Sequence, residues 1–132
     1  MTIQKYAKVE IASHQIETAL RLFFAKDDLF SVITLAGAAE EILGQLLALQ
    51  RGGTPGHRFS FTSVLKILRP GKQREARRNG GSGDEADVFV HMDLYREALF
   101  LLGRAIDDYQ TLSGALSAGM LKFQNEVRAK TP

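Results

Sequence analysis

The chain has 132 residues, the length of one ordinary domain, and can bury a hydrophobic core without a disulfide or a structural metal. It contains no cysteine, which excludes a disulfide framework and a thiolate metal site and favours a reducing compartment. Seventeen Lys and Arg residues oppose fifteen Asp and Glu residues, so the net charge is only +2. A field this weak does not by itself indicate a nucleic-acid binder, and any basic surface must be local. We therefore expect one cytoplasmic domain over residues 1–132.

The N-terminal part of the chain predicts a helix over residues 3–25, because one apolar stripe recurs there at spacings of three and four residues. The stripe consists of Val9, Ala12, Ile16, Ala19 and Phe23. Lys26 interrupts the pattern, and the two aspartates that follow it are good N-cap residues for a second helix.

The second predicted helix covers residues 28–50 and is apolar on more than one side, which is typical of a central helix. Such a helix needs cover from its own domain on one face, and we expect a second subunit on another, so the sequence favours a homodimer. Glu40 and Glu41 lie near its middle, where two carboxylates would cost several kcal/mol in lipid. We therefore interpret this helix as buried in protein and expect no association with a membrane.

The remaining sequence predicts short elements, one loop and two further helices. A short helix should end before Pro70, because the residue before a proline is pushed out of the α region. Residues 69–87 are basic, then glycine-rich, then acidic, and have almost no large apolar residues, so we expect a mobile loop. Apolar spacing of three and four then predicts helices over 93–112 and 116–128. The fold class is all-α, an up-and-down bundle of about four main helices with short additional ones.

Three stretches of the chain together resemble a group of small bacterial proteins related to the HEPN superfamily. They are LAGAAEEILGQLL at residues 35–47, ARRN at 76–79 and REALFLLGRAIDDY at 96–109. The resemblance implies a helical bundle that dimerises. It also implies a metal-independent ribonuclease, which is often paired with an antitoxin-like protein, or a domain that only binds RNA or a nucleotide.

The chain departs from the ribonuclease motif of that superfamily, which is an arginine followed after four to six residues by a histidine. Arg78 and Asn79 are followed by Gly-Gly-Ser-Gly, and no histidine stands at the required spacing from Arg77 or Arg78. Loss of a positioned acid–base group typically costs a factor of 10²–10⁴ in rate. We therefore expect a degenerate domain with no catalytic residues and little or no nuclease activity.

The candidate binding residues are arginines, since the guanidinium group suits a phosphate and needs no histidine beside it. The arginines are Arg74, Arg77 and Arg78, and the neighbouring Asn79 is a fourth candidate; all four lie in the basic part of the loop. The simpler interpretation of such a run is a solvated surface.

Glu40 and Glu41 are candidate polar residues of a cleft. The simpler interpretation is that one is solvated and the other pairs with an arginine, either Arg104 or Arg78. No histidine stands at ligand spacing from them, so we expect neither a metal site nor a cofactor.

Three functions follow from these patterns. The leading one is a degenerate HEPN-like domain that binds RNA, a nucleotide phosphate or a partner protein near Arg77. The second is an interaction module without a ligand. The third is an active ribonuclease, which would need a histidine such as His91 brought beside Arg78.

Overall fold

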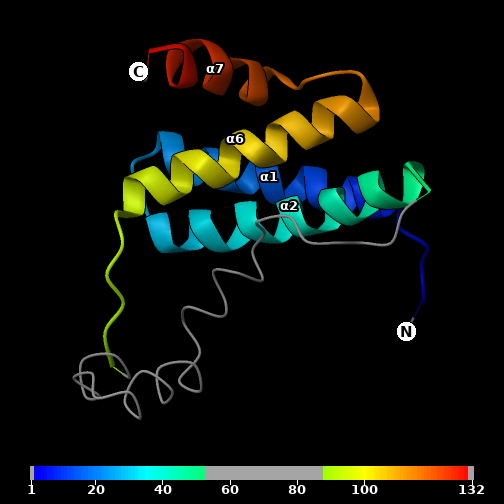
Figure 1. The fold of residues 1–132 in the computed structure, drawn as a ribbon, viewed down its shortest axis with the longest axis horizontal. Coiled ribbons are helices and arrows are strands. Elements are labelled where there is room, and N and C mark those ends of the chain that lie inside the picture. Colours follow the sequence, from blue (N-terminus) through cyan, green and yellow to red (C-terminus); the bar gives the residue numbers. More distant parts are fainter. Residues whose placement is uncertain (1, 53–87, 131–132) are drawn as a thin grey trace.

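The computed structural model describes residues 2–52 and 88–130, which form an all-α bundle (Figure 1). The helices are α1 (Lys8–Phe24), α2 (Leu29–Gln50), α6 (Leu94–Ser113) and α7 (Ala118–Glu126), followed by the 3-10 turn η1 (Arg128–Lys130). The predicted all-α helical bundle is thus confirmed. The short helix expected before Pro70 and the loop expected at 69–87 lie outside the described residues.

Local signals set most of the helix ends. The side chain of Asp28 accepts hydrogen bonds from the backbone N–H groups of Phe30 and Ser31 and caps α2. Asp93 caps α6 in the same way, through the N–H of Arg96. Gly114 ends α6 with a φ of 76°, the left-handed conformation that glycine adopts most easily.

The start of α1 differs from its prediction. The structure begins this helix at Lys8, and residues 2–7 are not helical. Ala7 offers no side-chain cap, and Ile3 and Tyr6 are 94% and 63% exposed. The expected start at Ile3 was wrong: residues 2–7 are exposed, so no burial of their side chains supports a helix there.

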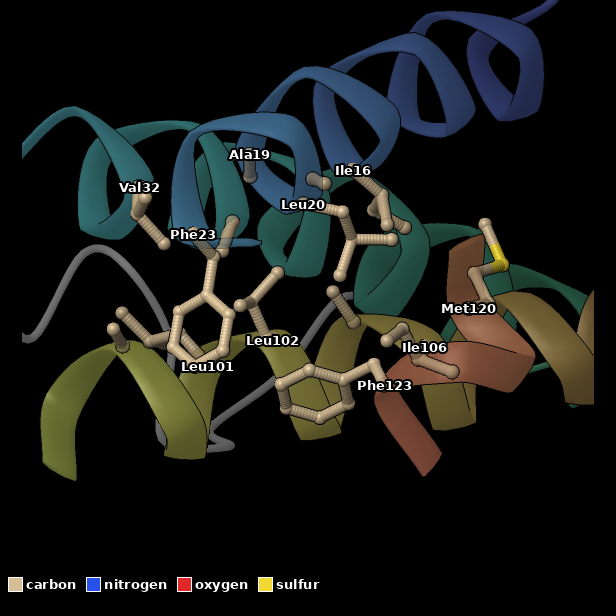
Figure 2. Close-up of a cluster of buried hydrophobic side chains, with 14 of the residues drawn as sticks. Ile16, Ala19, Leu20, Phe23, Val32, Leu101, Leu102, Ile106, Met120 and Phe123 are labelled. Carbon is tan, nitrogen blue, oxygen red and sulfur yellow. The ribbon is translucent and has the colours of Figure 1, made fainter. Parts of the chain in front are cut away.

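The core lies among α1, α2 and α6, and α7 covers its side away from α2 (Figure 1). Adjacent helices α1 and α2 are antiparallel, and so are α6 and α7, whereas α2 and α6 run in the same direction (Figure 1). Figure 2 shows large apolar side chains from all four helices meeting in one cluster, with Phe23 of α1 and Phe123 of α7 5.7 Å apart between ring centroids.

Helix α2 is the one helix within the described ranges that is long and apolar enough to cross a membrane by length and composition. Half of its most apolar window is buried inside the bundle. A core helix of a soluble protein meets the same criterion.

Candidate functional site

An ion pair between α2 and α6 forms the centre of the candidate site. Glu40 projects from the buried face of α2 and has no exposed surface. Its Oε1 atom lies 3.3 Å from Nη2 of Arg104 on α6. The prediction that one of the two adjacent glutamates pairs with an arginine is therefore confirmed, with Arg104 as the partner that the described residues show.

Arg104 lies between the interior and the surface. A quarter of its side chain is exposed, and its guanidinium carbon lies 5.5 Å from the ring centroid of Phe100, one turn earlier on α6. Phe100 is 45% exposed. The buried carboxylate and the aromatic ring hold the guanidinium in one place, since charge pairing and the face of an aromatic ring both attract a cation.

Glu41 has a different environment from Glu40. Neighbouring positions on a helix project about 100° apart, so only one of the two side chains points to the centre of the buried face. Glu41 is half-buried, and its Oε1 accepts a weak hydrogen bond of 3.4 Å from Nε2 of Gln45. The two carboxylates therefore lie in separate environments and do not form one acid–base pair.

The candidate phosphate-binding residues Arg74, Arg77, Arg78 and Asn79 lie outside the described residues. The C-terminal end of α2, before this segment, and the start of α6, after it, lie at opposite ends of the bundle (Figure 1).

Two of the three histidines fall on described residues. His14 is exposed on α1, and His91 is exposed just before α6, whereas His57 lies outside the described ranges. In the part of the chain that the structure describes, no three His, Asp or Glu side chains are grouped so that they could hold a metal ion.

The sequence patterns did not indicate a second interhelical ion pair. Arg128 of η1 donates two hydrogen bonds to Asp107 of α6, with Nη1–Oδ1 and Nη2–Oδ2 distances of 2.7 and 2.8 Å. The guanidinium lies over Gly103, where an added Cβ would come within 3.4 Å of it. Gly103, a small residue one turn before Asp107, was the available signal in the sequence. It does not identify Arg128, which follows the next helix, as the partner of Asp107.

Comparison with models of protein families finds no match, and comparisons with curated proteins and with solved structures find no significant match either.

Proposed function

We propose that the protein is a degenerate HEPN-like domain that binds RNA or a nucleotide through phosphate contacts from Arg74, Arg77, Arg78 and Asn79. The observation that carries the proposal is the pairing of Glu40 with Arg104. Glu40 belongs to the stretch at residues 35–47 and Arg104 to the stretch at 96–109, so two of the three stretches of resemblance pack against each other in the bundle.

The third stretch supplies the chemistry of binding. It contains two adjacent arginines and an asparagine, and several basic residues precede it. Guanidinium groups bind phosphate oxygens by two parallel hydrogen bonds, and this contact requires no proton transfer. The chain thus retains the groups for phosphate binding while lacking the histidine that cleavage would need at the motif spacing.

The test is a titration of the protein against labelled bulk RNA at two salt concentrations, without added metal, with both complex formation and RNA integrity followed. Arg77→Ala/Arg78→Ala is the test variant. Lys8→Ala/Arg21→Ala is the matched control, because it removes two positive charges from exposed positions of α1. Binding that weakens with salt, that the test variant loses and that the control keeps, with intact RNA, supports the proposal.

Two other results would favour the alternatives. Cleavage that disappears in Arg77→Ala/Arg78→Ala would restore an active ribonuclease, and His91→Ala would then test the missing acid–base group. Absence of binding at low salt would contradict RNA as the ligand and favour an interaction module, for example one that binds an antitoxin-like protein.

We also propose that the domain is a homodimer that uses the outer face of α2. This helix has no Lys or Arg, and its Phe30 and Leu49 are 65% and 58% exposed. Sedimentation equilibrium should give a dimer mass, and Leu49→Lys should shift the protein to a monomer mass. A monomer in the unchanged protein at high concentration would contradict the proposal.

A further inference from the structure

Helix α7 depends on its docking to the rest of the bundle. It has only nine residues, and a helix of this length is marginal by itself in water. Its two buried side chains, Met120 and Phe123, have no exposed surface and join the apolar cluster with side chains of α1 and α6 (Figure 2). There Phe123 meets Phe23 edge to face. These apolar contacts provide most of the attraction that keeps α7 helical and in place.

A polar contact of Ser117 holds the N-terminal end of α7, three residues after the glycine that ends α6. Gly114 has a φ of 76°, and nothing lies within 4 Å of the position where its Cβ would stand. Three residues later the hydroxyl of Ser117 donates to the Glu17 carboxylate on α1 and accepts from the N–H of Met120. The glycine is a suitable hinge, because a residue without a Cβ has few steric restraints on its backbone rotation.

The C-terminal end is fastened by the clamp between Arg128 and Asp107. Both ends of the guanidinium group are used, so the geometry is that of a bidentate pair. The two side chains are 43% and 49% exposed, and salt therefore screens the clamp. An exposed ion pair of this kind contributes less to holding α7 in place than the apolar contacts of the core do.

We propose that α7 is a cap that opens as one unit about Gly114 while α1, α2 and α6 remain folded. The Asp107–Arg128 clamp controls how often it opens. Opening uncovers the apolar surface at which Leu20 and Phe23 of α1 lie against α7. Separate opening of this kind is expected for a short helix that has few buried contacts and is held at its ends by polar interactions. The proposal is independent of RNA binding.

The test is native-state hydrogen exchange followed by NMR on the full chain, with low concentrations of denaturant. The amides of Leu121 in α7 and of Val127, its C-cap residue, should exchange faster than those of Leu102 and Ile106 in α6 and depend less on denaturant. Asp107→Asn, and separately Arg128→Gln, should speed exchange in α7 about two- to fivefold and leave α1, α2 and α6 unchanged. Raised salt should act in the same direction.

Arg21→Gln is the matched control, since it removes an exposed arginine of α1 whose guanidinium donates to Thr18 on its own helix. It should leave exchange in α7 unchanged. Equal exchange rates in α7 and in the centre of α6 would overturn the proposal. So would a clamp variant that speeds all helices alike, or one that leaves α7 unaffected.

Discussion

Nη2 of Arg104 on α6 lies 3.3 Å from Oε1 of the fully buried Glu40 on α2. A carboxylate inside a bundle is costly unless a positive group or several hydrogen bonds balance its charge. This ion pair therefore couples α2 to α6 inside the bundle.

Replacing Arg104 by methionine should lower the free energy of unfolding by about 1–3 kcal/mol, because the buried Glu40 then loses a positive partner. The measurement is denaturant unfolding of Arg104→Met, Glu40→Gln and the double variant. In this cycle the double variant should lose less than the sum of the two single variants, by about 0.5–3 kcal/mol. Additive losses would show that the two side chains are not coupled.

The stability contributed by Asp28 should depend on pH. A hydrogen bond from the Ser31 hydroxyl, followed by one from the Ser31 backbone, lowers the pKa of Asp28 below its ordinary value of 3.8. A lowered pKa in the folded state means that the contribution is complete above the unfolded pKa and is lost as pH falls through the folded value. The difference in unfolding free energy between wild type and Asp28→Ala should therefore shrink as pH falls below about 3.8.

The control for Asp28 is Ser31→Ala, which removes the largest cause of the shift. A carbon-detected NMR titration should show the pKa of Asp28 rising toward 3.8 in this variant. An unchanged titration would contradict the role of the Ser31 hydroxyl.

Gly114→Ala should destabilise the protein by about 1–2 kcal/mol through backbone strain, because the residue has a φ of 76°. No atom lies within 4 Å of its Cβ position, so a steric clash does not contribute. Gly114→Asn should cost less, since asparagine tolerates the left-handed region better. Thermal unfolding of the two variants gives the comparison, and equal losses would argue against strain as the cause.

Replacing single leucines of α2 by alanine should distinguish the buried face of this helix from its exposed face. Leu43→Ala removes a side chain with no exposed surface and should cost about 2–5 kcal/mol through lost burial and a cavity. Leu49→Ala, at a position 58% exposed, should change the unfolding free energy by no more than about 0.5 kcal/mol in the monomer. Chemical denaturation of both variants tests this, and a large loss for Leu49→Ala would show that its side chain is covered.

Local chemistry made several features of the fold predictable. Asp28, Asp93 and Gly114 mark helix ends because capping groups and a left-handed glycine act within a few residues of themselves. The start of α1 was not predictable in this way. Ile3 and Tyr6 lie within the range predicted to be helical, yet both side chains are exposed in the structure.

The sequence by itself determined the helical class, most helix boundaries and the buried stripe of each helix, because these depend on spacing and on neighbours along the chain. Only the tertiary structure decided that Glu40 pairs with Arg104 and that Arg128 clamps Asp107 over Gly103. Ion pairs between different helices depend on how the helices pack. Several arginines in the sequence carry the charge needed to pair with each of these carboxylates. Geometry chooses among them, since ion pairing and hydrogen bonding act over a few ångströms.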